Sequence, residues 1–350
     1  IRKNESNPEP FHIRSMAYHL LKQEGKALQN IKRAIALAKK EQAGNIHEFY
    51  ELQGSIQLSM NQQEEALSSF TSSIEHTKNP NHYSYYQRGL IYFKKEAYQK
   101  AEKDLLKAIR IIPADYTNDR LNIQMKLGQI YTFFEEPEKA IHAYNRVISI
   151  NPENHLAYLY RGSHYAVKMD QEIPGYAEKV IHDFNKVLQN YNPGNENKIY
   201  ILNQRGQAHM ETGAYEKAIE DFTESINLKP QAYTLALRGD TRRLNGNYEG
   251  AIDDFSSALE LSPNFSWVYY RRGWTKEFLN DFDGALNDYN KAIEADPDYI
   301  YNYLARGTLL LNHFDPEEAI PDFKKVVEMQ TQPHSSGNAK PFALLHLGRE

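Results

Sequence analysis

A small residue recurs along the chain at spacings of 33 to 44 residues, and this period constrains the fold more strongly than any other feature of the sequence. The series is Ser15, Gly54, Gly89, Gly128, Gly162, Gly206, Gly239, Gly273, Gly307 and Gly348. A second series of small or branched residues keeps step with it, as Ala27, Ala66, Ala101, Ala140, Val180, Ala218, Ala251, Ala285 and Ala319. A large apolar residue follows each of these four positions later, as Ile31, Phe70, Leu105, Tyr144, Phe184, Phe222, Phe255, Tyr289 and Phe323. Repetition of this length is typical of chains that stack small units instead of enclosing one common core.

One copy of the repeat, between Ser266 and Pro297, shows what the unit is. At helical spacing, Tyr269 and Gly273 share one side of a first helix, and Ala285 and Tyr289 share one side of a second. A turn signal separates the two helices, and the proline ends the second because it lacks an amide donor. Two short helices cannot bury their apolar faces alone, so the pattern requires that neighbouring units stack.

Proline closes five units at the same place, as Pro113, Pro152, Pro230, Pro263 and Pro297. With these anchors, about residues 8 to 350 resemble a tetratricopeptide repeat (TPR) array. The resemblance implies an all-α fold, a right-handed α-α superhelix (TPR solenoid) of about nine helix-turn-helix repeats plus a terminal half repeat. After a disordered or fraying lead at 1–10, the expected units lie near 11–39, 47–80, 82–115, 121–154, 155–194, 199–231, 232–265, 266–299 and 300–333, with a half unit at 341–350.

Each anchor also has a physical reason that is independent of the family. A glycine in the middle of a helix costs about 1 kcal/mol relative to alanine, so a periodic glycine predicts the close approach of another backbone. The large residue of the second helix is expected to fill the space between helices.

Several stretches depart from the regular repeat. Residues 116–120 and 195–198 are expected to lengthen the links between units, and about six extra residues with Pro174-Gly175 lengthen one turn. That long turn is either a tolerated insertion or a contact loop. Pro321 falls inside a second helix and is expected to distort its first turns. The chain begins without methionine and ends after a first helix, which suggests a fragment cut from a longer protein, or else a terminal cap.

Composition excludes several classes of function. The chain is 41% hydrophobic and 25% charged, and no apolar run approaches the roughly 18 residues of a membrane span. Cysteine is absent, which excludes disulfides, thiolate metal sites and thiol catalysis. The formal charge of -5 argues against general nucleic-acid binding. Residues 8–41 are basic and residues 211–298 acidic, which reflects either solvated outer faces or complementary ends that promote self-association.

Two charged residue types, arginine and aspartate, occur together in the same repeats. Arginine precedes the glycine in six units, and in the same six an aspartate precedes the large residue of the second helix. The pairs are Arg88 with Asp104, Arg161 with Asp183, Arg205 with Asp221, Arg238 with Asp254, Arg272 with Asp288 and Arg306 with Asp322. Since arginine can hold a carboxylate with two parallel hydrogen bonds, the co-occurrence predicts ion pairs within a unit or between neighbours. The alternative is a habit of a recently duplicated repeat.

No motif for chemistry is present. The sequence contains no phosphate-cradling glycine loop, no HExxH and no nucleophile elbow, so we expect no enzyme, no catalytic residue, no metal and no cofactor. The remaining candidate for a functional site is the inner surface of the array. In arrays of the resembled type, first helices line a concave groove, and this implies a partner-binding surface made of Tyr200, Asn203, Gln207, Tyr233, Asp240, Arg243, Trp267, Tyr270, Trp274, Glu277, Tyr301 and Leu304.

Three aromatic residues of this set, Trp267, Tyr270 and Trp274, fall on one helical stripe and include both tryptophans of the chain. Tyr269 and Gly273 already fill the packing positions of that helix, so the stripe is either a ligand surface or a contact between successive first helices. The sequence thus favours a non-enzymatic scaffold for a peptide or helix of a partner protein. The alternatives are a sensor or recruitment segment of a larger enzyme or signalling protein, and RNA binding, which the acidic segment disfavours.

Overall fold

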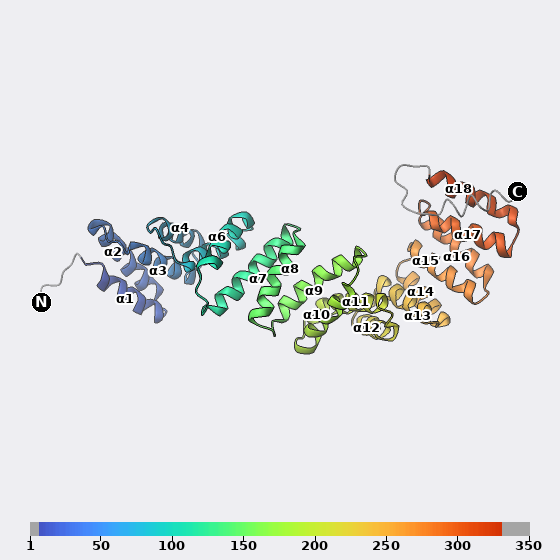
Figure 1. Cartoon of the computed structure of the whole chain (residues 1–350), viewed down its shortest axis with the longest axis horizontal. Helices are drawn as coiled ribbons and strands as arrows, with labels where there is room; N and C mark the ends of the chain where they lie inside the picture. The colour runs from blue at the N-terminus through green and yellow to red at the C-terminus, as the bar shows by residue number, and fades with distance from the viewer. Residues whose placement is uncertain (1–6, 331–350) are drawn as a thin grey trace. The chain divides into compact units, whose positions relative to one another are not determined.

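The computed structural model describes residues 7–330, and every regular element in this range is helical. The chain divides into two compact units, Ile1–His164 and Tyr165–Glu350, and the division falls inside α9 (His155–Asp170). In both units the helices follow one another as consecutive packed pairs (Figure 1). The fold is therefore an all-α solenoid.

The helices of the first unit precede α9. They are α1 (Glu9–Leu20), α2 (Glu24–Glu41), α3 (Ile46–Ser59), α4 (Gln63–Glu75), α5 (His82–Lys94), α6 (Tyr98–Ile111), α7 (Thr117–Phe133) and α8 (Pro137–Ile150).

The helices of the second unit follow α9. They are α10 (Ala177–Asn190), α11 (Gly194–Glu211), α12 (Tyr215–Leu228), α13 (Ala232–Leu244), α14 (Tyr248–Leu261), α15 (Ser266–Phe278), α16 (Phe282–Ala295), α17 (Ile300–His313) and α18 (Ile320–Gln330), with a 3₁₀ turn η1 (Pro316–Ala319) before the last.

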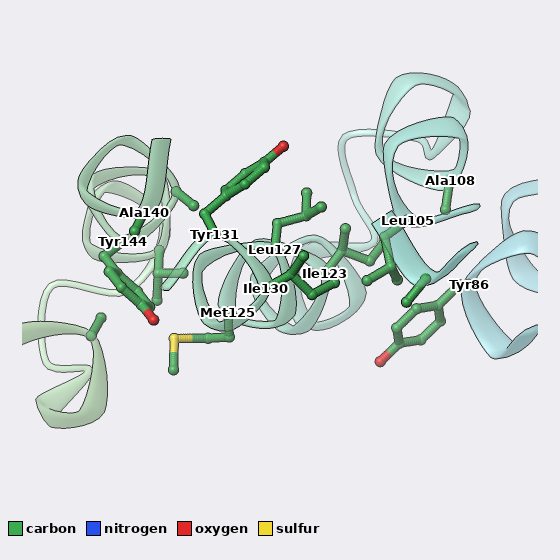
Figure 2. Close-up of a cluster of buried hydrophobic side chains, with 14 of the residues drawn as sticks. Tyr86, Leu105, Ala108, Ile123, Met125, Leu127, Ile130, Tyr131, Ala140 and Tyr144 are labelled. Carbon is green, nitrogen blue, oxygen red and sulfur yellow. The ribbon is translucent and has the colours of Figure 1, made fainter. Parts of the chain in front are cut away.

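Each helix packs on its partner and on the next pair, so the core is a chain of small clusters. Figure 2 shows one of them: Leu105 of α6 and Tyr144 of α8 reach α7 from opposite sides and meet its apolar residues Ile123, Leu127 and Ile130. All five are at most 2% exposed. A helix that buries side chains against neighbours on both sides depends on stacking, as the sequence predicted.

At the periodic glycine, the nearest atoms belong to the large side chain of the second helix. A Cβ built on Gly128 would lie 2.5 Å from Tyr144 Cε1, and one on Gly206 would lie 2.6 Å from Phe222 Cε1. Beside Gly239 and Gly273 a second backbone also comes close, with Ala251 O and Ala285 O each 3.2 Å from such a Cβ. The large residue of the second helix therefore fills the space beside the glycine, as expected, and a close second backbone is seen at Gly239 and Gly273.

Two expected links are helical instead. α7 begins at Thr117 and α11 at Gly194, so residues 117–120 and 195–198 form first turns of helices and do not lengthen the links. The long turn between α9 and α10, residues 171–176, is as expected. The distortion expected near Pro321 is a short 3₁₀ turn before α18. Residues 1–6 of the expected lead and the half unit at 341–350 lie outside the described residues.

Candidate functional site

The twelve predicted groove residues lie on four first helices of the second unit. Tyr200, Asn203 and Gln207 belong to α11; Tyr233, Asp240 and Arg243 to α13; Trp267, Tyr270, Trp274 and Glu277 to α15; and Tyr301 and Leu304 to α17. Each of these helices contacts the next, α11 with α13, α13 with α15 and α15 with α17. The predicted residues therefore belong to adjacent helices of one continuous layer.

A pocket of about 220 Å³ opens between α15 and α17, and we call it the α15–α17 pocket. Five of the twelve predicted residues line it: Tyr270, Trp274, Glu277, Tyr301 and Leu304. The structure adds three that sequence reasoning did not include, Tyr289, Ala305 and Thr308. Thr308 follows Gly307 directly, a spacing that the groove pattern itself uses, whereas Tyr289 is a core residue of α16 whose hydroxyl end reaches the pocket.

Glu277 is the one residue with a formal charge in the lining of this pocket. The Tyr289 hydroxyl donates a hydrogen bond to its Oε1. Burial raises the pKa of Glu277, while the Tyr289 hydrogen bond and nearby His313 act in the opposite direction. Burial and the neighbouring Glu277 carboxylate raise the pKa of the Tyr289 phenol, so Tyr289 remains a donor. The pocket therefore combines a carboxylate with aromatic walls.

Arg271 was not among the predicted residues, but it crosses the aromatic stripe of α15. Its guanidinium carbon lies 5.4 Å from the ring centroid of Trp267, 5.9 Å from that of Tyr270 and 5.5 Å from that of Trp274. These are cation–π distances. The signal was available in the sequence, since Arg271 stands four residues after Trp267 and three before Trp274.

Asp240 and Arg243 of α13 differ from the prediction that they present themselves in the groove. Their exposed fractions are 6% and 8%, and Arg243 Nη2 lies 2.8 Å from Asp240 Oδ1. The Arg243 guanidinium also lies 4.4 Å from the Trp274 ring centroid, and Arg271 Nε lies 3.8 Å from Asp240. The Asp240–Arg243 pair therefore packs against the rings of α15, and its charges are buried and not accessible to a partner. The aromatic stripe thus also forms contacts between successive first helices, which was the second interpretation.

The α11 end of the predicted surface is separate from the pocket. Asn203 Nδ2 donates to Thr234 Oγ1 at 3.0 Å, and the Tyr233 hydroxyl donates to Gln207 Oε1 at 3.4 Å. Tyr200 and Tyr233 are exposed. None of the four predicted residues Tyr200, Asn203, Gln207 and Tyr233 lines the α15–α17 pocket, nor does Trp267, which packs against the cluster of α13 and α14.

The predicted arginine–aspartate pairs position these first helices. In five repeats the arginine Nε and Nη2 groups donate hydrogen bonds of 2.5–2.9 Å to the two carboxylate oxygens of the aspartate in the same repeat. These pairs are Arg88 with Asp104, Arg205 with Asp221, Arg238 with Asp254, Arg272 with Asp288 and Arg306 with Asp322. We call these five the arginine–aspartate pairs. The sixth predicted pair, Arg161 with Asp183, would join residues of the two units, which are described separately.

The third guanidinium nitrogen of each arginine reaches the preceding repeat. Arg272 Nη1 donates to Ser256 Oγ of α14 at 2.9 Å, and Arg88 Nη1 donates to Thr71 Oγ1 of α4 at 3.3 Å. The aspartate is nearly inaccessible, with Asp288 at 0% exposed. A second cation compensates it there, since Lys276 Nζ lies 2.8 Å from Asp288 Oδ2. Each arginine therefore fixes its first helix against two second helices at once.

Within residues 7–330, no three His, Asp or Glu side chains converge as metal ligands would. None of the helices in the same range has the length and apolar character needed to cross a membrane.

Four segments of the chain match family models described as tetratricopeptide repeat, at residues 82–153, 199–232, 232–265 and 266–299. None of the curated proteins matches the sequence. Among solved structures, the chain is similar to MamA at 19% identity, covering 63% of this chain and 99% of that one with a TM-score of 0.37. It is similar to YrrB, described as a TPR protein with an unusual peptide-binding site, at 16% identity, with 60% and 100% covered and a TM-score of 0.44. A tetratricopeptide repeat protein from Parabacteroides merdae is 18% identical, with 77% and 98% covered and a TM-score of 0.43.

Proposed function

The chain belongs to the tetratricopeptide repeat family, and from this premise we propose that it is a non-enzymatic protein–protein interaction scaffold. Its ligand is a peptide or a helix of a partner protein, which lies along the first helices α11, α13, α15 and α17 of the second unit. Repeats of this family are typical of such scaffolds rather than of enzymes.

The observation that carries this proposal is the α15–α17 pocket. It gathers Tyr270, Trp274 and Tyr301 around the carboxylate of Glu277 on one surface. Aromatic side chains that are half-buried beside polar groups are the composition of interface hot spots, because they bury a large area on binding and lose little side-chain entropy.

Affinity capture from native lysate followed by mass spectrometry tests the proposal. The bait is the full chain, compared with the variant Trp267→Ala, Tyr270→Ala, Trp274→Ala and with a control, Tyr116→Ala, Phe133→Ala, which removes exposed aromatic rings from the first unit. Far-UV circular dichroism confirms that all three baits are equally helical. A synthetic peptide from a captured partner should then bind the bait and the control with equal affinity and the α15 variant at least tenfold more weakly. Identical captured sets for all three baits would contradict the proposal.

A further inference from the structure

Within residues 7–330 the carboxylate of Glu277 forms no salt bridge, although His313, which lines an adjoining pocket together with it, lowers its pKa. Within residues 7–330, no lysine or arginine forms an ion pair with it, and its one hydrogen bond comes from the Tyr289 hydroxyl. By contrast, Asp288 of the following helix is held by both Arg272 and Lys276. A partly desolvated carboxylate in a pocket lacks the compensation that the buried aspartates of the same repeats receive.

The walls of the α15–α17 pocket are suited to a cation. Tyr270 and Trp274 lie side by side with ring centroids 6.3 Å apart, and Tyr301 of α17 completes the aromatic lining. The face of an aromatic ring attracts a positive charge, and this attraction grows where water is excluded. An uncharged apolar side chain could also touch these rings, but it would cover Glu277 without pairing it, which costs free energy.

Positive charges nearby do not occupy the pocket. Arg243 and Arg271 lie against Trp274, but neither lines the pocket, and Asp240 lies within 4 Å of both guanidinium groups. The wider field favours a basic ligand: residues 165–330 hold 17 lysines and arginines against 27 aspartates and glutamates, a net charge of -10. An acidic surface steers a basic partner toward it and repels an acidic one.

We infer that the α15–α17 pocket is the subsite for a basic side chain, lysine or arginine, of the bound peptide, with Glu277 as its counter-ion and Tyr270, Trp274 and Tyr301 as its cation–π walls. The inference rests on the proposed function and names the chemistry of its ligand. Burial raises the pKa of Glu277, so the ionised carboxylate costs folding stability until a cation binds it.

Peptide display on the full chain tests the inference without a known partner. A library of random dodecapeptides is selected on the chain, and binders that lose affinity for the variant Trp267→Ala, Tyr270→Ala, Trp274→Ala are kept as groove-dependent. These peptides should carry lysine or arginine at one fixed position. Replacing that residue by norleucine or glutamine should weaken binding to the chain about tenfold, as expected for a cation paired and stacked in a partly desolvated site.

The variant Glu277→Gln identifies the counter-ion. It keeps an acceptor for the Tyr289 hydroxyl but removes the charge, so the basic peptide and its norleucine analogue should bind it with nearly equal affinity. The matched control, Glu294→Gln, removes the same charge from an exposed position on α16 and should retain the tenfold preference. Groove-dependent peptides without a basic residue, or an equal norleucine penalty on Glu277→Gln, would overturn the inference and leave the proposed function standing. If no selected peptide depends on the α15 rings, both fail.

Discussion

The second unit carries four of the five arginine–aspartate pairs, whereas three of the four repeats in the first unit show that it closes the same position between its helices in three different ways. It has one pair, Arg88 with Asp104. In another repeat the Ser69 hydroxyl lies 2.7 Å from the side-chain amide of Gln57, and in a third the position is apolar, with Leu127 and Ala143 both buried. The glycine and the large residue facing it are common to both units. The glycine contact thus sets the fold, and the polar bond beside it is variable.

The two units also differ in which residues hold the left-handed position in the turns between paired helices. In the first unit each turn holds one residue with positive φ, and these are Lys22, Asn61, Glu96 and Glu135. In the second unit Gly213, Gly246 and Asn280 take this place in three of the turns, and the longer α9–α10 turn holds both Glu172 and Gly175. Left-handed backbone costs a non-glycine side chain about 1 kcal/mol, which asparagine partly avoids. The second unit therefore combines less strained turns with more ion pairs.

The units also differ in charge. Residues 1–164 contain 22 lysines and arginines against 18 aspartates and glutamates, a net of +4, whereas residues 165–330 have a net of -10. Both tryptophans and the α15–α17 pocket lie in the acidic unit. Repeats that share one packing scheme can thus differ wholly in the surface that they offer a partner.

The largest expected effect comes from breaking a pair. Asp254 is 3% exposed and is held by Arg238 and Arg242, so Asp254→Ala leaves two partly buried cations without their carboxylate and should cost about 3 kcal/mol. The adjacent Asp253 is exposed, and Asp253→Ala should stay within about 0.5 kcal/mol. Urea unfolding followed by the emission of Trp267 and Trp274 reports on this unit. Equal midpoints for the two variants would show that the pairs do not stabilise it.

The glycines should behave alike in both units. Gly128→Ala and Gly206→Ala each place a methyl group against a fully buried ring and should cost about 2–3 kcal/mol. Nothing lies within 4 Å of a Cβ on Gly25, so Gly25→Ala should be neutral or stabilise by up to about 1 kcal/mol. Thermal unfolding measures all three. A cost confined to one unit would contradict the idea that this contact sets the fold throughout.

The neutral contact of the first unit should be weaker than the pairs. Ser69→Ala removes the hydroxyl beside Gln57 and should cost about 1 kcal/mol, because a hydrogen bond between uncharged groups is lost. Urea unfolding followed by far-UV circular dichroism measures it. A cost as large as that of Asp254→Ala would remove the distinction between the units.

The turns offer a change of opposite sign. Glu135 is exposed with φ 57°, so Glu135→Gly should stabilise the first unit by about 0.5–1 kcal/mol, since glycine adopts this backbone without strain. Gly213→Ala in the second unit has φ 75° and should destabilise by a similar amount. Melting temperatures that move in the same direction for both variants would refute this reading of the turns.

The smallest effect depends on pH. Burial raises the pKa of Glu277, so its stabilising contribution is present below its unfolded pKa and is lost as the pH rises through its folded pKa. Glu277→Gln should therefore melt slightly above the parent chain at pH 7, and the difference should shrink toward pH 4. A lower melting temperature for the variant at pH 7 would mean that the carboxylate is already compensated.

The sequence predicted the helix pairs and the pairing of arginine with aspartate, but it left open whether each pair lies within one repeat or between neighbours. Arg272 and Asp288 are sixteen residues apart across one tight turn, which places them opposite each other on antiparallel helices, and both flank packing anchors. The sequence could not show that Ser256 of the preceding repeat accepts a third hydrogen bond or that Lys276 adds a second cation. Those contacts depend on how one repeat rotates against the next, which side-chain spacing within a repeat does not record.

The candidate site was predicted in part for a similar reason. Tyr270 and Trp274 stood out because the packing positions of their helix were already filled. The resemblance to the family also placed Asp240 and Arg243 on the inner side, but it could not show that they are buried against α15. Tyr289 was assigned to the core, and only the structure shows its hydroxyl beside Glu277.

The most direct test of binding at α15 uses the two tryptophans as reporters. A fluorescently labelled groove-dependent peptide is titrated with the full chain, and its anisotropy is recorded together with tryptophan emission in the reverse titration. If the peptide occupies the α15–α17 pocket, both signals should saturate with the same dissociation constant, because Trp274 lines the pocket and Trp267 lies one helical stripe away. Saturating anisotropy with unchanged tryptophan emission would place the ligand elsewhere and contradict binding at this surface.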